Sequence, residues 1–308
     1  ASRIDDVNIS ANSDDYYRSI ATGNWNQIAT WESSANNVTW NAAVMPPTKY
    51  AKTITVRSPH VVSITASVSI DETIINAGGY VCLKTGTLTI NDGAGNDMQV
   101  DGTFADSSAT NTNWLAASTW SLSAAATFIK ISASSAAFWQ ARFMGGISTI
   151  PSTAKWIVRK SGAPNPSVNT LGAYYPNLTI ENNVAGIWTT GVSSSFAGTG
   201  AFNGPIVKGS LDIGGSGTST VNFINSQTYL TTTFVQGNIL VRNGNTYTNS
   251  GIGTEVQGNL TVDGTVTYGA GTSILTFSGN SAQVISGAGS LNIYNMWMNK
   301  PSNDVKSK

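Results

Sequence analysis

The sequence predicts an all-β fold: a right-handed parallel β-helix, or β-solenoid, with an aromatic cap at its N-terminal end. One phrase carries most of this prediction, because Val207-Lys-Gly-Ser-Leu-Asp-Ile213 returns in altered form at 235–241 and at 256–262. Recurrence at an interval of roughly 20 to 30 residues is typical of repeat architectures. Apolar and polar residues alternate within each copy, so each strand has one apolar face. One copy cannot bury that face alone, whereas a stack of copies forms a continuous core.

The composition also indicates strands and turns. Only 10% of the residues are charged, against roughly 25% in ordinary soluble domains, and 16 basic residues balance 16 acidic ones. This balance leaves no electrostatic footprint for nucleic acid or for an anionic membrane surface. No run of about 18 apolar residues occurs, so we expect no membrane insertion. The single cysteine, Cys82, lies in an apolar run and is expected to be a small buried hydrophobe.

The N-terminal part divides into two segments. Residues 1–20 contain four aspartates and few apolar residues, which predicts a solvated leader or an edge-pairing strand. Residues 21–52 contain Trp25, Trp31 and Trp40. The first coil of a solenoid has no neighbour on one side, so large aromatic residues there are expected to cap the open core. The alternative is an aromatic platform for a sugar ring, which requires exposed ring faces.

The rest of the chain divides into segments that differ in how regularly apolar and polar residues alternate. Residues 53–104 contain short apolar-alternating strands separated by Gly- and Asp-rich turns, as expected of successive coils. The pattern loosens over 105–205, where we expect wider, aromatic-rich coils or an insertion, with the solenoid continuing through it. Residues 206–300 contain the regular repeats, and 301–308 form a short basic tail.

Aromatic side chains are the main candidates for binding a ligand. Those in the loose region lie among the basic residues of the segment 142–160, an arrangement suited to an acidic polysaccharide or a nucleic acid. The small net charge disfavours nucleic acid, and solvated strand faces account for most such basic residues. Surface glycans are the expected ligands. The possible ligand-facing aromatics are Trp25, Trp31, Trp40, Trp139 and Trp156.

The turn from Asn91 to Asp97 supplies oxygen atoms of the kind that calcium prefers. Asp92, Asn96 and Asp97 are therefore the candidate calcium ligands. The turn lacks the ordered carboxylates and the final glutamate of an EF-hand loop. Capping of backbone N–H groups explains the same residues without a metal.

Catalytic chemistry has weaker candidates. His60 is the only histidine, which excludes a two-histidine metal site and leaves a Ser-His-Asp arrangement without identifiable partners. Glycoside hydrolysis commonly needs two carboxylates, and turn capping again explains the ones available. We therefore expect no enzyme activity, no catalytic residue and no organic cofactor. The candidate pairs one coil apart are Asp71 or Glu72 with Asp92, and Asp92 with Asp97 or Asp101.

Several stretches carry a family resemblance: Tyr17–Arg18 leading into Thr22–Trp25, Thr30–Glu32, the strand pair Thr53–Val56 and His60–Val62, Gly86–Asp92, and Phe277–Asn280 with Gln283–Gly287. Through them the chain resembles the β-helical repeat regions of large secreted and cell-surface proteins of Bacteroidetes, the cargo of the type IX secretion system. The resemblance implies a solenoid architecture and an adhesin-like role at the cell surface or beyond it. It implies no catalytic residue.

We therefore predict a non-enzymatic extracellular structural or adhesive rod. The first alternative is a filament subunit, since an exposed strand edge can recruit a strand from another copy of the chain. Residues 1–17, or the tail after Pro301, are then the available donor strands. The second alternative is a carbohydrate-binding module. Isolated rods would support the first hypothesis, fibres that persist on dilution the filament subunit, and glycan binding the carbohydrate-binding module.

Overall fold

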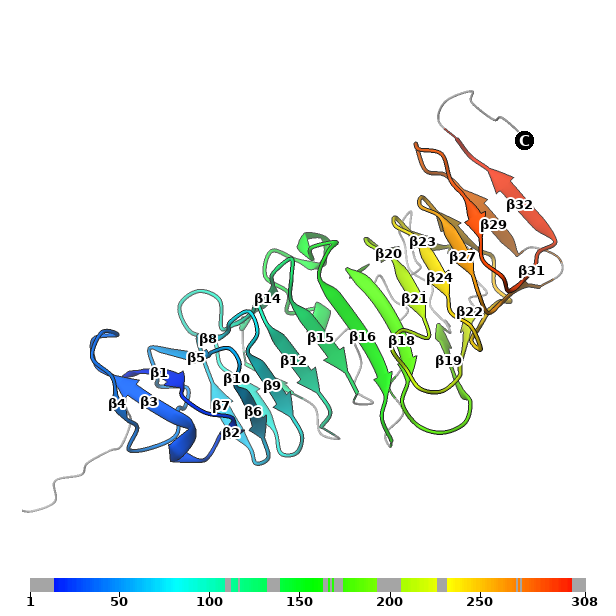
Figure 1. Ribbon diagram of the computed structural model, residues 1–308. Coiled ribbons are helices and arrows are strands. Elements are labelled where there is room, and N and C mark those ends of the chain that lie inside the picture. Colours follow the sequence, from blue (N-terminus) through cyan, green and yellow to red (C-terminus); the bar gives the residue numbers. More distant parts are fainter. Residues whose placement is uncertain are drawn as a thin grey trace, which may run out of the picture.

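The chain forms an elongated β-solenoid in which coils succeed one another along a single axis (Figure 1). The computed structural model describes residues 14–108, 112–115, 117–131, 139–162, 166, 168, 174–192, 206–225, 232–269, 271 and 273–300. The coils stack in parallel, which confirms the predicted fold class. Two short 3-10 segments, η1 (Ile28–Thr30) and η2 (Ile147–Thr149), interrupt the strands.

One parallel sheet, the spine sheet, runs the whole length of the solenoid. Each of its eleven strands forms one wall of a coil. Its apolar side chains stack in register, so that Leu260 lies between Ile239 and Ile285. The strands are β2 (Gly23–Asn24), β6 (Val61–Ile64), β9 (Tyr80–Leu83), β12 (Thr103–Asp106), β15 (Thr127–Lys130), β16 (Lys155–Lys160), β18 (Asn177–Asn182), β21 (Leu211–Ile213), β24 (Ile239–Val241), β27 (Leu260–Val262) and β30 (Ile285–Ser286).

Two other sheets complete the coils of the N-terminal half. A seven-stranded sheet contains, in spatial order, β14 (Trp120–Leu122), β11 (Met98–Val100), β8 (Thr73–Ile75), β5 (Thr53–Val56), β1 (Tyr16–Ser19), β3 (Trp31–Ser34) and β4 (Asn41–Ala42). A three-stranded sheet contains β13 (Asn113–Trp114), β10 (Leu88–Ile90) and β7 (Val68–Ile70).

A different pair of sheets completes the coils of the C-terminal half. The six-stranded sheet contains β17 (Tyr174–Tyr175), β20 (Ile206–Val207), β23 (Thr233–Val235), β26 (Gly253–Val256), β29 (Ile274–Phe277) and β32 (Asn295–Met298). The five-stranded sheet contains β19 (Trp188–Val192), β22 (Val221–Asn225), β25 (Thr246–Asn249), β28 (Thr265–Tyr268) and β31 (Ser290–Asn292).

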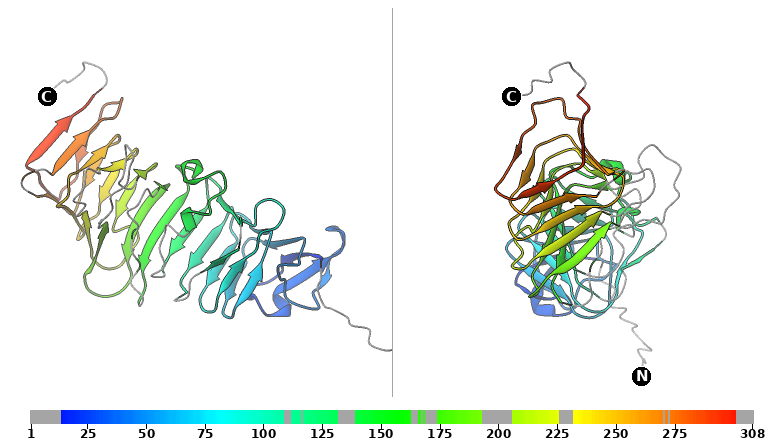
Figure 2. Two further views of the ribbon diagram at one scale, coloured as in Figure 1. Left: turned by 180° about the vertical axis from the view of Figure 1, so that it is seen from behind. Right: turned by 90° about the vertical axis from the view of Figure 1, so that its right-hand side faces the viewer.

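The change of sheets explains why the sequence pattern loosens between 105 and 205. Two of the three walls end at β14 and β13, and their replacements begin at β17 and β19. The spine sheet meanwhile continues without a break through β15, β16 and β18. The solenoid thus continues through this region, and the view along the rod shows the coils of both halves superimposed (Figure 2).

The N-terminal end is closed by antiparallel strands. β1 pairs in parallel with β5 on one side and antiparallel with β3 on the other, and β3 pairs antiparallel with β4. Beneath these strands the rings of Trp25 and Trp31 pack edge to face, with centroids 5.0 Å apart. Within the segment 1–20, Tyr16–Ser19 is therefore an internal strand rather than an edge, and residues 1–13 lie outside the described residues.

The repeated phrase forms the corner between the six-stranded sheet and the spine sheet, and it places Asn or Ser after the glycine. The Asn238 side chain accepts a hydrogen bond from the Asn259 N–H (2.8 Å), and the Asn259 side chain accepts one from the Val284 N–H (2.9 Å). Ser210 does the same for the Asn238 N–H (3.1 Å). Each coil thus satisfies a backbone donor of the next coil at a corner where strands cannot.

The glycine of the phrase allows the corners to stack closely. The Gly258 N–H donates to the Gly237 carbonyl (3.0 Å), and a Cβ on Gly258 would lie 2.5 Å from that same oxygen. We expect Gly258→Ala to lower the free energy of unfolding by about 1–3 kcal/mol, because the backbones must move apart. Urea unfolding measures this loss. Gly269→Ala is the matched control, since its Cβ would meet only ordinary contacts at 3.6 Å; equal losses in both variants would contradict the explanation.

The inner rows of the spine sheet are mainly apolar, but they contain the buried Asn182 and one buried pair of charged residues. Asp106 and Lys130 are register neighbours on β12 and β15, and both side chains are buried. Burial lowers the pKa of Lys130 to about 8, and the negative charge of Asp106 opposes that shift. Two opposite charges at adjacent positions are the arrangement in which burial of each is least costly.

The last coil leaves its core residues uncovered. Ile285, Met296 and Met298 continue the inward rows of Leu260, Leu275 and Phe277, yet all three are exposed. The two ends of the described rod therefore differ: antiparallel strands close one, and the other presents apolar side chains. The tail 301–308 lies outside the described residues.

Candidate functional site

Four of the five aromatic residues predicted to face a ligand are core residues. Trp25, Trp31, Trp139 and Trp156 are each at most 1% exposed, so the prediction that they form a binding platform is wrong for them. Trp25 and Trp31 pack against each other beneath the cap. In the middle of the rod, the ring centroids of Trp139 and Trp156 lie 5.0 Å and 4.3 Å from that of Phe128. Large apolar rings contribute more by leaving water than by remaining at the surface.

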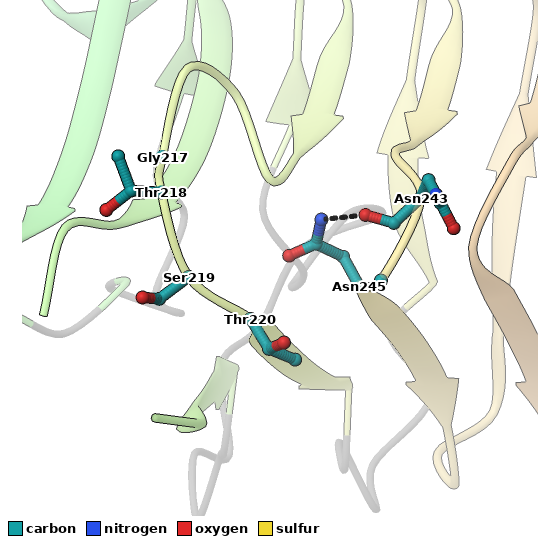
Figure 3. Close-up of a pocket in the computed structure, with 7 residues that line it drawn as sticks. Gly217, Thr218, Ser219, Thr220, Asn243 and Asn245 are labelled. Atoms are coloured by element: carbon teal, nitrogen blue, oxygen red, sulfur yellow. Dashed lines mark hydrogen bonds between the residues drawn. The ribbon is translucent and has the colours of Figure 1, made fainter. Parts of the chain in front are cut away.

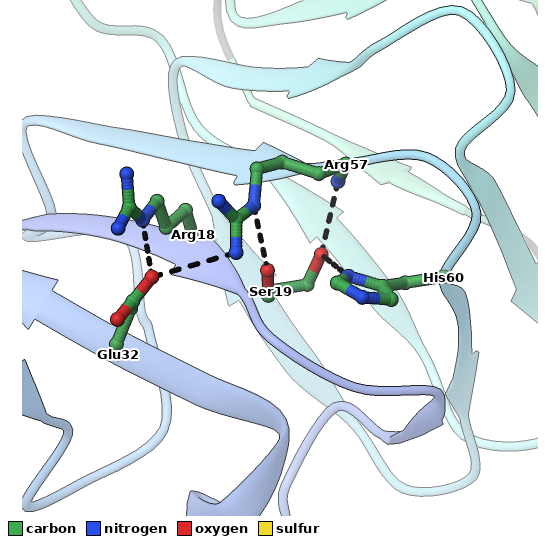
Figure 4. A network of polar contacts seen from close by, with 5 residues as sticks. All are labelled: Arg18, Ser19, Glu32, Arg57 and His60. Atoms are coloured by element: carbon green, nitrogen blue, oxygen red, sulfur yellow. Dashed lines mark hydrogen bonds and ion pairs between the residues drawn. The ribbon is translucent and has the colours of Figure 1, made fainter.

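Trp40, the fifth candidate, is half-buried, and one of its ring faces is occupied. The Arg18 guanidinium lies 4.0 Å from the ring centroid, a cation–π arrangement. Glu32 in turn forms ion pairs with Arg18 and Arg57. Trp40 thus contacts a polar network of the cap rather than forming an open platform. Figure 4 shows the Arg18, Glu32 and Arg57 side chains of that network.

The same network contains the single histidine. The Ser19 hydroxyl contacts His60 Nδ1 at 2.8 Å and accepts a hydrogen bond from the Arg57 N–H at 2.9 Å (Figure 4). This is a serine–histidine contact, but the Ser19 side chain is fully buried and the Glu32 carboxylate is held by arginines. A nucleophile must reach its substrate, so the contact is structural: it ties β1 to the turn before β6.

The three calcium candidates have separate partners. Asp97 is buried and accepts hydrogen bonds from the N–H groups of Gly93 (2.8 Å) and Thr119 (2.6 Å). Asn96 donates to the Ser121 hydroxyl (2.7 Å), and Asp92 accepts from the Ala117 N–H (3.3 Å). Capping of backbone donors therefore accounts for these carboxylates. Within the described ranges, no group of three or more His, Cys, Asp or Glu side chains could hold a metal ion.

The carboxylates that the structure brings together are Asp71 and Asp97, a pair that differs from each predicted one. Burial, followed by a hydrogen bond with Asp97 and charge repulsion from it, raises the pKa of Asp71 to about 7. Because Asp97 already accepts two backbone N–H bonds, the shared proton resides on Asp71. The pair lies beside a groove of about 490 Å³ that Tyr16, Lys52 and Glu72 also line.

This pair makes stability depend on pH. The folded protein retains a proton on Asp71 between pH 3.8 and about 7, where the unfolded chain has lost it. Stability from this group is therefore complete below pH 3.8 and is lost as the pH rises through 7. We expect the Tm to fall over this range and the fall to be smaller in Asp71→Asn, as followed by circular dichroism. Asp14→Asn, on an exposed side chain, is the control and should retain the wild-type profile.

The glycine-rich stretch 214–217 is a turn, with φ of +110° at Gly214 and +49° at Gly215. A notch of about 170 Å³ lies between this turn and the next coil, lined by 217–220 and 243–245 (Figure 3). The buried amide of Asn245 donates to the carbonyl oxygens of Arg242 and Asn243 and accepts from the Val221 N–H. Its hydrogen-bonding groups are used in holding the coils together.

Two other predictions concern the single cysteine and the basic segment 142–160. Cys82 is free and buried, as expected, with its sulfur 3.7 Å from the Ser107 hydroxyl. In the basic segment, Arg159 forms an ion pair with the buried carboxylate of Glu181, which also accepts from the Ser216 N–H and hydroxyl. That carboxylate joins three successive coils.

No helix of the described residues is long and apolar enough to cross a membrane.

A site that the sequence did not single out lies on the outer face of the last coils. Of the tryptophan side chains that the structure describes, only Trp297 is exposed, at 60%. Its register partner is Thr276, and the partner of Phe234 on the same outer row is Glu255. A hollow of about 710 Å³ is lined by Glu255, Thr276 and residues 296–299. An exposed aromatic ring with hydroxyl, amide and carboxylate groups nearby is the usual composition of a polar-ligand site.

Comparison with known proteins identified no matching protein family, no similar curated protein and no similar solved structure.

Proposed function

We propose that the chain is a non-enzymatic rod with a structural or adhesive role outside the cell, like the repeat regions of Bacteroidetes surface proteins that its sequence resembles. The observation that carries this proposal is the spine sheet, whose eleven parallel strands connect the two ends of the described solenoid. A stack in which each coil buries the apolar rows of its neighbours is a stiff spacer. It can hold side chains of its outer faces at a distance from an attachment point.

The composition supports the location. Low charge, abundant Ser, Thr and Asn, and a single buried thiol suit a protein that needs neither a reducing compartment nor an anionic partner. Among the carboxylates considered for a hydrolase, Asp92 and Asp97 cap backbone N–H groups, and Asp71 shares a proton with Asp97. These features favour a binding or spacing role over catalysis.

Negative-stain electron microscopy of the purified chain across a dilution series, with mass measurement, tests the proposal. We expect isolated short rods of monomer mass at every concentration. An adhesion assay on glycan-coated surfaces then tests the adhesive role, for which retention of the rods is the expected result. Compact particles would overturn the proposed rod. Rods that are retained on no glycan would overturn its adhesive role.

A filament subunit is the second candidate, because the uncovered residues Ile285, Met296 and Met298 form an apolar end face that accepts a further coil. Two features count against head-to-tail stacking of copies. The opposite end is covered by β3 and β4. Tyr16 and Tyr17 of the expected donor segment belong to β1, which already pairs with β3 and β5 of the same chain. Regular fibres that persist on dilution would favour the filament over the isolated rod.

A further inference from the structure

The last four strands of the six-stranded sheet carry four register neighbours on their outer face, in a row that continues to the buried Ile206 of β20. The register places Phe234 of β23 beside Glu255 of β26. It also places Thr276 of β29 beside Trp297 of β32. Glu255 is likewise the register partner of Thr276. The side chains therefore follow in the order Phe234, Glu255, Thr276 and Trp297. Their strands succeed one another along the axis of the solenoid, as β23, β29 and β32 show in Figure 1.

Trp297 is exposed because its side chain points to the outer face of the sheet, whereas its neighbours on β32 point inward. Met296 and Met298 continue the buried residues Leu275 and Phe277, so a further coil would cover them. Trp297 continues Thr276, which lies on the outer face, so a coil stacked below it would not bury its ring. A large aromatic side chain in such a position loses the free energy of burial that a core position provides.

The spacing of the row suits an extended ligand. Neighbouring strands lie about 4.8 Å apart, so Phe234 and Trp297 are separated by three steps, or about 14 Å. Two residues further along, three of the four strands carry exposed polar side chains, Gln236, Gln257 and Asn299, and β29 carries the half-buried Ser278. The backbone N–H groups of Gln257 and Asn299 continue the strand ladder, which holds this polar row beside the aromatic one.

The charge of the row restricts the ligand further. Among the described residues, the Glu255 carboxylate has no ion-pair or hydrogen-bond partner, although it lines the hollow of about 710 Å³ with Trp297. A carboxylate accepts hydrogen bonds and repels anions. Hydroxyl or ammonium groups of a ligand satisfy it, whereas sulfate or carboxylate groups do not.

We infer that this face binds a glycan chain of neutral or amino-bearing hexopyranose rings that runs along the solenoid axis. The apolar faces of its sugar rings pack on Trp297 and Phe234. Its hydroxyl or amino groups donate to Glu255 and to the amide row. The inference rests on the proposed adhesive function and assigns that function a site.

The test uses the full chain and three soluble probes: cellohexaose, chitohexaose and the hexamer of glucosamine, measured by calorimetry and by the emission of the exposed tryptophan. We expect saturable binding of at least one probe and weakening by about tenfold or more in Trp297→Ala, the effect typical of losing an aromatic anchor. Trp297→Phe should retain part of the affinity. Glu255→Gln should weaken the glucosamine hexamer more than cellohexaose, because only the former carries positive charge.

Tyr294→Ala is the matched control, since Tyr294 is an exposed aromatic residue outside the hollow, and it should leave binding unchanged. Circular dichroism melts verify that each variant is folded. Absence of saturable binding to all three probes, or equal affinity in Trp297→Ala and the parent chain, would overturn the inference. Rods that still adhere to a glycan surface while Trp297→Ala has no effect would overturn this site and leave the adhesive function standing.

Discussion

Replacing Leu260 with aspartate is expected to unfold the C-terminal coils. The Leu260 side chain is 1% exposed and lies in register between Ile239 and Ile285. The substitution removes about 1.5–3 kcal/mol of apolar burial and adds several kcal/mol for placing a carboxylate in the core. A total loss above about 4 kcal/mol is a large fraction of the stability of a domain.

Hydrogen exchange measures this outcome coil by coil. Because each coil contacts only its neighbours, protection should be lost in β24, β27 and β30 and retained in β5, β8 and β9. Thr261→Asp is the control, since Thr261 is the next residue on the same strand and faces outward; it should cost less than about 1 kcal/mol. An unchanged melting temperature in Leu260→Asp would show that this residue does not face the core.

The second large effect is expected at Trp156. Its ring is fully buried against Phe128, with Tyr175 at 5.6 Å and Trp120 at 6.2 Å. Trp156→Ala should lower the free energy of unfolding by about 3–5 kcal/mol, as observed for large core aromatics. Denaturant unfolding measures the loss.

Trp156→Phe is the matched control, because the indole N–H of Trp156 has no hydrogen-bond partner among the described residues. The smaller ring keeps the aromatic contacts and loses no hydrogen bond, so it should cost much less than alanine. If Trp156→Ala instead reduced glycan binding without a loss of stability, the interpretation of Trp156 as a core residue would be wrong.

The fold class could be predicted because its determinants are local. Alternation in phrases such as 256–262 defines strand faces, and the glycine of each phrase marks a corner where backbones approach closely. The Asn and Ser residues after that glycine are equally local signals, although their role became clear only when Asn238 and Asn259 were seen to cap the next coil.

The candidate site could not be predicted in the same way. The segment Asn295–Met298 contains apolar residues at three successive positions, so alternation alone does not indicate which one faces outward. The register with Leu275, Thr276 and Phe277 decides it. The pairing of Asp71 with Asp97 likewise depends on the length of one coil, which no local pattern reveals.

By itself, the sequence determined that this chain is a stack of short parallel strands around an apolar core, because the period of two and the repeated corner are properties of neighbouring residues. Only the tertiary structure decided which aromatic rings are buried and which is exposed. Exposure depends on the coil above and the coil below, and these are set by register between residues 20 to 30 positions apart. For that reason Trp25, Trp31, Trp139 and Trp156 belong to the core, and Trp297 faces outward.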